Sequence, residues 1–519
     1  MSGNPDFHLT PPEARAVYVP CYARRMNLFA KKSLAQLDRE SARNPLRRSL
    51  GRVQLIALGV GSIIGTGIFV MTGTAASQNA GPALVLSMIL TTIGCAFSGL
   101  CYAEFAAMVP IAGSAYTYAY ATIGEFIAWI IGWDLILEYA LSVSTVAVGW
   151  SGYFASLARD IGLHIPVALT TPLGKVVTDP SGATVTGIVN LPAIFIVVLV
   201  SMLLISGIRQ SANANTVMVF IKAMVLVVFV VAGAAYVKRA NLTPFIPPNT
   251  GAFGHFGWSG VLRGAGVMFF AYIGFDAVTT AAQESKDPQR DMPVGILGSL
   301  AICTVIYIAV AIVLTGIVHY SKLNVADPLA VGIDATGLTW LSPVIKVSAL
   351  FGLFSTMLVQ LLGQTRIFFS MARDGLLPRV FGSVHPRFRT PHVSTLLTGT
   401  VCALVAGFTP IEVLGQLVSI GTLLAFVLVC IGVVILRKTA PENRRPFRTP
   451  GVPWVPALGA IICLAQMVGL PGETWVRLVI WLGVGLVIYF LYGHAHARAA
   501  RAAGEDTVSA ADVAVLSEA

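Results

Sequence analysis

Long apolar runs recur along almost the whole chain, and they constrain its fold more than any other feature. A helix of about 20 apolar residues crosses the roughly 30 Å hydrocarbon core of a bilayer. Runs that can do this occupy about 53–79, 83–109, 121–154, 190–208, 213–237, 258–283, 293–318, 338–371, 393–409, 412–436, 453–471 and 474–493. Of the 519 residues, 56% are hydrophobic and only 11% are charged, and the mean hydropathy is +0.78. A soluble domain of any size is excluded, and an all-α integral membrane protein with about twelve transmembrane helices is predicted.

The basic residues predict the orientation. The first 50 residues are polar and rich in Arg and Lys, and they lack the short apolar core and small-residue cleavage site of a signal peptide. With this tail placed in the cytoplasm, cytoplasmic segments hold about 24 of the 34 Lys and Arg residues and external segments about 8, as the positive-inside rule expects. Both termini are therefore expected to be cytoplasmic. The net charge of +10 indicates topology and contact with anionic lipid, through short loops such as Arg437-Lys438 and Arg444-Arg445, and no nucleic-acid partner.

Cysteines and histidines give no pattern of a metal or cofactor site. Six of the seven cysteines fall in the apolar runs and Cys21 in the tail, with none at metal-ligand spacing. The eight histidines all lie in tails, loops or the ends of runs. We therefore expect no metal, no cofactor and no enzymatic activity.

Two of the apolar runs are interrupted at mid-depth. In 53–79 the interruption is Gly-Ser-Ile-Ile-Gly-Thr-Gly, residues 61–67, and in 258–283 it is Phe-Phe-Ala-Tyr-Ile-Gly-Phe-Asp, residues 269–276. Lipid offers no hydrogen-bond partner to freed backbone groups, so such a break persists only where protein, water or a ligand satisfies them. A pair of broken helices in corresponding positions is typical of a secondary transporter and marks its binding site.

The breaks lie in the first and sixth runs, five apart, which predicts a five-plus-five inverted repeat. The expected organisation is a basic cytoplasmic tail over 1–50, repeats over 51–237 and 238–436, helices eleven and twelve over 437–495, and a cytoplasmic C-terminal tail over 496–519. The longest connection, 152–190, is expected outside, either as a lid or as an ordinary loop.

Four segments resemble the amino acid, polyamine and organocation (APC) transporters, most closely the bacterial members of the cationic amino acid transporter family. They are GSIIGTGIFVMTG (61–73), CYAEFAAMVPIAGSAYTYAYATIGEFIAWIIGWDLILEYAL (101–141), FFAYIGFDAVTTAAQESKDPQRDMPVGI (269–296) and GQTRIFFSMARDGLLP (363–378). The resemblance covers nearly all of residues 50–495, and the chain departs from vertebrate members, which carry two more spans. It implies a LeuT-like fold with helices 1 and 6 broken, and an amino acid permease of a bacterial inner membrane that works by alternating access.

Freed backbone groups at the two breaks form the candidate substrate-binding site. The amides around Ile64, Gly65, Thr66 and Gly67 begin a half-helix, and the positive end of its dipole suits a carboxylate. The freed carbonyls of Ile63, Phe270, Ala271 and Ile273 can accept from an ammonium group. An L-amino acid carries both charges at fixed separation, so this recognition would not depend on its side chain. The alternative for Gly61 and Gly65 is a small-residue packing motif between helices.

Lys222 is the candidate for proton coupling. It lies in 213–237, about nine residues from the cytoplasmic end and so roughly 14 Å deep. A buried ammonium is costly, and an ionisable residue inside a membrane is by default a functional candidate. The resemblance places it where related sodium-coupled transporters hold sodium, and implies a link between the first span and Ser355 in 338–371. Alternatively the lysine is fixed permanently against backbone carbonyls, which is compatible with exchange without net proton flux.

Four other polar or charged residues lie within the runs. Glu138 either assists proton movement or is a bundle-internal carboxylate satisfied by neighbouring hydroxyls. Gln360 is placed by the resemblance at the substrate side chain, which favours polar or cationic substrates, whereas Tyr307 and Phe275 could form an apolar wall instead. Glu104 lies near the cytoplasmic end of its run and is expected either to lie at the membrane interface or to anchor a loop. Asp276 is expected to cap the second half-helix.

The function predicted from sequence is secondary active transport of L-amino acids by proton symport, with either cationic amino acids or a broad range of amino acids as substrates. Two alternatives stay open at this point: an amino acid or polyamine exchanger without net proton coupling, and a sensor that uses the same site without moving its ligand. A channel is disfavoured because repeated pore loops and charged rings are absent from the sequence.

Overall fold

The computed structural model describes residues 28–31, 50–108, 114–178, 182–207, 212–280, 285–388, 390–442 and 444–503. These residues are helical apart from one short hairpin and the connections. In the first half the elements are α2 (Arg52–Ile63), η1 (Gly67–Met71), α3 (Thr72–Ala75), η2 (Ala76–Ala80), η3 (Gly81–Ala83), α4 (Leu84–Met108), α5 (Ser114–Thr122), α6 (Glu125–Asp160), η4 (Val167–Leu169), α7 (Leu191–Ile205) and α8 (Ala212–Ala234).

The second half continues in the same manner. Its elements are η5 (Arg239–Leu242), α9 (Gly257–Met268), η6 (Phe269–Tyr272), α10 (Ala277–Thr280), α11 (Pro288–Ile317), η8 (Tyr320–Lys322), α12 (Pro328–Asp334), α13 (Leu341–Arg373), η9 (Arg379–Gly382), α14 (His392–Phe408), α15 (Ile411–Thr439), α16 (Trp454–Gly469), α17 (Gly472–Ile488), η10 (Tyr489–Gly493) and α18 (His494–Ala503). Each apolar run predicted from the sequence overlaps at least one of these helices.

Seven helical stretches in the described residues are long and apolar enough to cross a membrane. They lie at Gly67–Met108, Glu125–Asp160, Val217–Ala234, Pro288–Ile317, Leu341–Arg373, Ile411–Thr439 and Gly472–Ala499. Four shorter apolar helices, α2, α7, α14 and α16, accompany them. The all-α prediction is confirmed at this level, whereas the count of about twelve spans and the inverted repeat stay predictions.

Prolines mark several helix starts, because proline fits the first turn of a helix and not its interior. Pro192 stands in the first turn of α7, whose N-cap Asn190 accepts a hydrogen bond from the Ala193 amide at 3.2 Å. Pro410 and Pro471 directly precede α15 and α17. The helix boundaries therefore follow from local chemistry, and the tertiary contacts follow from the apolar faces.

The only strands of the described residues lie in the connection between α6 and α7. β1 (Val176–Thr178) and β2 (Thr184–Thr186) pair antiparallel with Val177 opposite Val185. Lys175, beside this hairpin, forms an ion pair of 2.7 Å with Glu412 in the first turn of α15. The predicted long connection is thus attached to the helical body by a charge pair.

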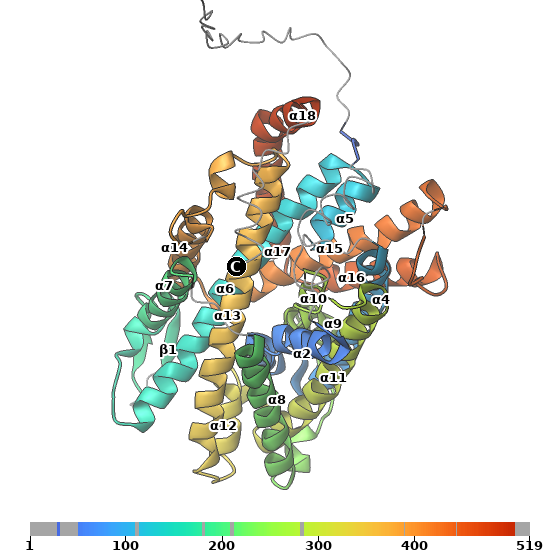
Figure 1. Ribbon diagram of the computed structural model, residues 1–519. Coiled ribbons are helices and arrows are strands. Elements are labelled where there is room, and N and C mark those ends of the chain that lie inside the picture. Colours follow the sequence, from blue (N-terminus) through green and yellow to red (C-terminus); the bar gives the residue numbers. More distant parts are fainter. Residues whose placement is uncertain are drawn as a thin grey trace, which may run out of the picture.

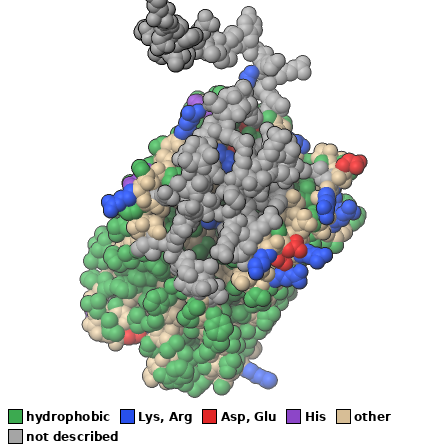
Figure 2. Space-filling model, in the orientation of Figure 1, with side chains coloured by type: hydrophobic (Ala, Val, Ile, Leu, Met, Phe, Trp, Pro, Cys, Tyr) green, Lys and Arg blue, Asp and Glu red, His purple; other side chains and the backbone are tan. Residues whose placement is uncertain are grey.

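The arrangement separates a buried interior from an apolar exterior. In Figure 1, α18 and α5 lie toward one end of the molecule and α12 toward the other, with α6 and α13 running through its middle. Exposed large apolar residues on outer helices include Phe195, Phe220, Leu396, Ile461 and Val479. Figure 2 shows a broad, nearly uncharged hydrophobic surface over the lower part of this view. Such a surface fits contact with lipid acyl chains.

Candidate functional site

The first break separates α2 from η1. Ile64 has extended backbone (ψ 96°) and its amide still donates to the Val60 carbonyl at 3.0 Å, which closes the last turn of α2. The next helical bond begins at the Gly65 carbonyl, which accepts from the Phe69 amide at 3.3 Å. Between them, the amides of Gly65 and Thr66 donate to no other backbone group of the described chain. Two N–H donors are therefore free where the sequence predicted a carboxylate site, but the Ile64 amide, which was predicted to belong to that site, is used by the last turn of α2.

The second break follows η6. Ile273 is extended (ψ 136°) and Gly274 has φ +117°, a conformation that L side chains rarely adopt. The Asp276 carboxylate accepts from the Gly274 amide at 3.2 Å, so it stabilises the break just before α10. The carbonyls of Ala271 and Ile273 accept no hydrogen bond within the described residues. Two acceptors are therefore free at this break, whereas the Phe270 carbonyl, which the sequence also predicted to be free, accepts from the Ile273 amide at 3.4 Å.

The two breaks pack directly against each other. A Cβ atom on Gly67 would lie 2.2 Å from the Cα of Ala271, and a Cβ on Gly274 would lie 2.8 Å from the backbone of Ser62. Both distances are shorter than any real Cβ contact, so glycine is required at each position. The free donors of one break and the free acceptors of the other are thereby held together in the buried interior.

Two hydroxyl groups at the first break also have no partner. The side chains of Ser62 and Thr66 are 6% and 1% exposed, and neither hydroxyl oxygen makes a hydrogen bond within the described residues. Buried polar groups are normally satisfied, so an exception indicates bound water or a ligand. The chemistry of the pair of breaks is thus a set of unsatisfied donors and acceptors.

Lys222 of α8 reaches the first break. Its side chain is 1% exposed, and Nζ donates to the carbonyls of Gly61 and Ile64, the latter at 2.8 Å. It also lies 3.5 Å from Oγ1 of Thr356 on α13. The predicted link between the first span and 338–371 is present in this form, with Thr356 as the described contact. Ser355, the neighbouring residue, is buried as well and stays a prediction as a coupling partner.

Tyr307 of α11 hydrogen-bonds to one of the backbone carbonyls that were predicted to bind the substrate. Its hydroxyl donates to the Ile63 carbonyl at 2.8 Å, and its ring packs edge-on against Tyr272 at 5.4 Å. The sequence suggested an apolar wall for Tyr307, and the hydroxyl contact adds a polar role. A carbonyl oxygen has two lone pairs, so Ile63 keeps one for a substrate ammonium.

Glu138 and Asp134 lie one turn apart on α6. They are 2% and 1% exposed, and Oε2 of Glu138 and both carboxylate oxygens of Asp134 have no hydrogen-bond partner within the described residues. Gly421 of α15 faces Asp134, because a Cβ there would lie 2.7 Å from Oδ1. No contact between Glu138 and Lys222 is present among the described residues.

Gln360 lies one turn beyond Thr356 on α13 and is 6% exposed. Residues four apart share a helix face, so its amide points to the side of α13 that carries Thr356. Its predicted contact with a substrate side chain stays a prediction.

Sequence reasoning missed Thr356, the hydroxyl of Tyr307 and Asp134. No feature of the sequence distinguished Thr356 from Ser355; the structure shows that Gly352, four residues before Thr356 on the same helix face, packs on Lys222, where a Cβ would lie 3.4 Å from that side chain. For Asp134, its position one turn from Glu138 on a predicted span was the available signal. No feature of the sequence identified Tyr307 as a donor to Ile63.

Comparison with known proteins identifies the family. The model of the amino acid permease family matches residues 50–491. The chain is 47% identical to the methylthioribose transporter of Bacillus subtilis (strain 168), over 91% of this chain and 98% of that protein. It is 45% identical to the branched-chain amino acid permease BcaP of the same organism, over 91% of this chain and 99% of that protein. It is 37% identical to the vacuolar cationic amino acid transporter 4 of Arabidopsis thaliana, over 77% of this chain and 64% of that protein.

These matches cover almost the whole apolar part of the chain. The protein is therefore a multi-pass membrane transporter rather than an enzyme, and it belongs to the amino acid permease family of the APC superfamily.

Proposed function

We propose that this protein is a secondary active permease that moves L-amino acids across a bacterial inner membrane by proton symport with alternating access. The orientation has both termini in the cytoplasm. The chain is organised as inverted repeats over 51–237 and 238–436, in which the helices containing residues 61–67 and 269–276 are the broken first and sixth.

The observation that carries the proposal is the match between the free groups of the two breaks and a zwitterion. The amides of Gly65 and Thr66 supply donors for a carboxylate, and the carbonyls of Ala271 and Ile273 supply acceptors for an ammonium group. The hydroxyl of Thr66 is a third free donor on the same segment. Amides at the start of a helix favour an anion by hydrogen bonding and by the helix dipole together.

Lys222 supports the coupling part of the proposal. It is the buried cation that holds the end of α2 through the carbonyls of Gly61 and Ile64. In the protonated form it donates to both carbonyls, and in the neutral form it has fewer donors and no charge. Proton binding would therefore change how tightly the first half-helix is held, and this half-helix adjoins the substrate groups. Glu138, Ser355 and Thr356 are the residues that could pass or stabilise the proton.

The relatives differ in what their names say they carry, which sets the candidates for the substrate. One is a branched-chain amino acid permease, others are cationic amino acid transporters, and one is a methylthioribose transporter. The second candidate function is accordingly uptake of a thiosugar. Methylthioribose has neither a carboxylate nor an ammonium group, so the donor and acceptor pairs at the breaks favour an amino acid. The buried amide of Gln360, on the face of α13 that carries Thr356, favours a broad range that includes polar or cationic side chains.

Competition binding tests this recognition. Purified protein is equilibrated with labelled leucine and challenged with leucine, arginine, isoamylamine, 4-methylvalerate and methylthioribose. The two amino acids are expected to compete, whereas the amine without a carboxylate and the acid without an ammonium group should fail. Saturable direct binding of labelled methylthioribose, together with failure of labelled leucine and labelled arginine to bind, would establish the thiosugar function instead.

Exchange and sensing are separated from symport by transport itself. An exchanger takes up label only when liposomes are preloaded with counter-substrate, and a sensor binds without accumulation. Uptake into empty liposomes driven by an inward proton gradient is expected only for a symporter.

A further inference from the structure

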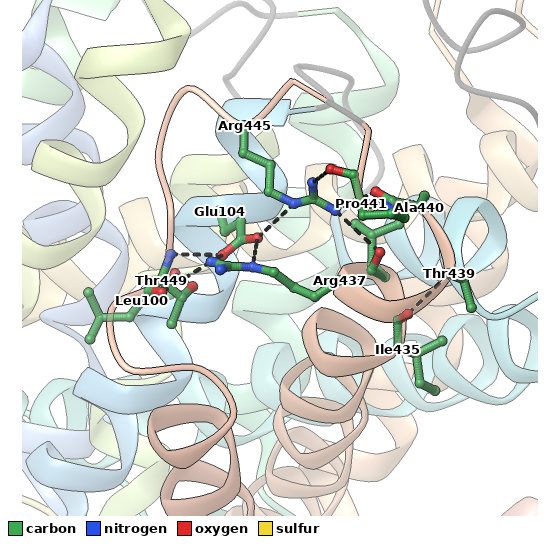
Figure 3. Close-up of polar contacts among 10 residues, drawn as sticks. Leu100, Glu104, Ile435, Arg437, Thr439, Ala440, Pro441, Arg445 and Thr449 are labelled. Atoms are coloured by element: carbon green, nitrogen blue, oxygen red, sulfur yellow. Dashed lines mark hydrogen bonds and ion pairs between the residues drawn. The ribbon is translucent and has the colours of Figure 1, made fainter.

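Glu104 near the end of α4 is the centre of a buried ion network. Its carboxylate, 1% exposed, accepts from Nε and Nη2 of Arg437 at 3.0 and 2.8 Å and lies 3.4 Å from Nε of Arg445. It also accepts from the Thr449 amide at 2.7 Å. Figure 3 shows both guanidinium groups pointing at this carboxylate, that of Arg437 from the last turn of α15 and that of Arg445 from the segment that joins α15 to α16. The predicted loop-anchoring role of Glu104 is confirmed.

The network gives the connection between α15 and α16 a fixed shape. Arg445 donates to the carbonyls of Leu436, Ala440 and Pro441 at 3.2, 2.7 and 3.0 Å, which satisfies the C-terminal end of α15. Thr449 donates through its hydroxyl to the Leu100 carbonyl at 3.0 Å. The sequence suggested that Arg437 and Arg445 contact lipid, but their guanidinium groups are used inside the protein.

Three other cations of this connection remain available. Lys438, Arg444 and Arg448 are exposed, and their side chains make no hydrogen bond or ion pair within the described residues. Segment 437–448 carries five basic residues and one acidic residue, Glu442, and Glu104 adds a second negative charge beside it. The anchored segment therefore presents a surplus of positive charge to its surroundings.

The position of these cations relates them to the bilayer. α16 begins at Trp454, which is 75% exposed, and its outward side continues with Leu458, Ile461 and Val468, at 45%, 60% and 64% exposure. Tryptophan is enriched at the membrane–water interface, so Trp454 marks the headgroup level and the following residues the acyl-chain level. Figure 2 shows Lys and Arg side chains on the flank where α16 lies in Figure 1.

We propose that Lys438, Arg444 and Arg448, held in place by the Glu104 network, form a binding site for the headgroup of an anionic phospholipid whose acyl chains lie along α16. Basic clusters next to a transmembrane helix attract anionic lipid headgroups. The prediction that these loops face the cytoplasm places the site in the inner leaflet. Its chemistry does not involve the substrate groups, so the proposal is independent of the transport assignment.

The test is lipid binding to the full-length protein by native mass spectrometry. Phosphatidylglycerol and phosphatidylethanolamine are titrated against the wild type, against Lys438→Gln/Arg444→Gln/Arg448→Gln, and against a control triple variant. The control is Lys238→Gln/Arg239→Gln/Lys322→Gln, which removes three exposed cations from other connections. All six positions are exposed, so both variants should fold.

The site variant is expected to bind phosphatidylglycerol on the order of a hundredfold more weakly than the wild type, at about fivefold for each cation. The control should bind it like the wild type, and phosphatidylethanolamine binding should not change in either. Equal loss in both variants would indicate a general effect of net charge and overturn the site. Unchanged binding in the site variant would overturn it as well, and displacement by inorganic phosphate alone would show a phosphate site rather than a lipid site.

Discussion

Replacing Lys222 by Met keeps an unbranched side chain that is one atom shorter and removes its charge. Nζ donates to the carbonyls of Gly61 and Ile64, and a hydrogen bond from a charged donor contributes about 1.5–3 kcal/mol. Losing both therefore costs about 3–6 kcal/mol, while removing a buried ammonium returns several kcal/mol of desolvation free energy. The two terms oppose each other, so folding is expected to survive and stability is a poor measure of the role of Lys222.

Proton-driven accumulation of substrate is expected to be lost completely in Lys222→Met. With the membrane potential clamped, one pH unit supplies about 1.4 kcal/mol per proton, which corresponds to a tenfold accumulation of substrate for one proton per substrate. In proteoliposomes with an inward gradient of two units, the wild type is expected to approach about a hundredfold accumulation. Lys222→Met should only equilibrate label across the membrane, while retaining exchange with preloaded substrate.

Lys346→Met is the matched control. Lys346 is 3% exposed and pairs with Asp160 at 2.7 Å, away from both breaks. This variant is expected to keep gradient-driven accumulation even if its stability falls. If Lys222→Met accumulates substrate to the same ratio as the wild type, the assignment of proton coupling to this lysine is wrong.

Further substitutions test the substrate groups and the anchored connection. A Cβ on Gly65 would lie 3.3 Å from Cγ2 of Thr356, which is a tight contact. In equilibrium binding, Gly65→Ala should therefore weaken substrate binding by about tenfold or less, and Gly65→Leu should abolish it. Equal substrate affinity of the Ala and Leu variants would contradict the backbone site. Gln360→Ala should change the order of competing substrates, and an unchanged order would remove Gln360 from side-chain selection. Glu104→Gln should lower the free energy of unfolding in SDS titrations by about 3–5 kcal/mol, because Arg445 loses its buried counter-ion. Adding Arg445→Gln should recover part of this loss, and strict additivity of the two changes would argue against the pair.

Much of the site was predictable because membrane physics leaves few options for a broken helix. The glycines at 61–67 and 274 predicted both helix breaks. Counting residues along 213–237 placed Lys222 at a depth in the membrane where its charge needs a partner. The structure adds that the two breaks touch through Gly67 and Gly274. Composition and run length alone also indicated the helical membrane class.

Contacts between distant segments were out of reach of the sequence. Ser355 and Thr356 are adjacent hydroxyl residues about 100° apart around the helix axis, and only the packing of α13 on α8 places Thr356 near Lys222. The sequence predicted Arg437 to be a loop cation in contact with lipid, whereas the structure pairs it with Glu104, 333 residues away in sequence. Long-range pairing of this kind depends on the whole fold, so residue type and spacing do not reveal it.

The most direct test of the central proposal is uptake of a panel of radiolabelled amino acids, with methylthioribose alongside, into proteoliposomes containing the wild-type protein. Uptake is measured with and without an inward proton gradient, and with sodium present or absent. We expect at least one L-amino acid to accumulate in a manner that requires the proton gradient and does not require sodium. Saturable binding without accumulation of any amino acid under every condition would contradict the proposal of a proton-driven amino acid permease.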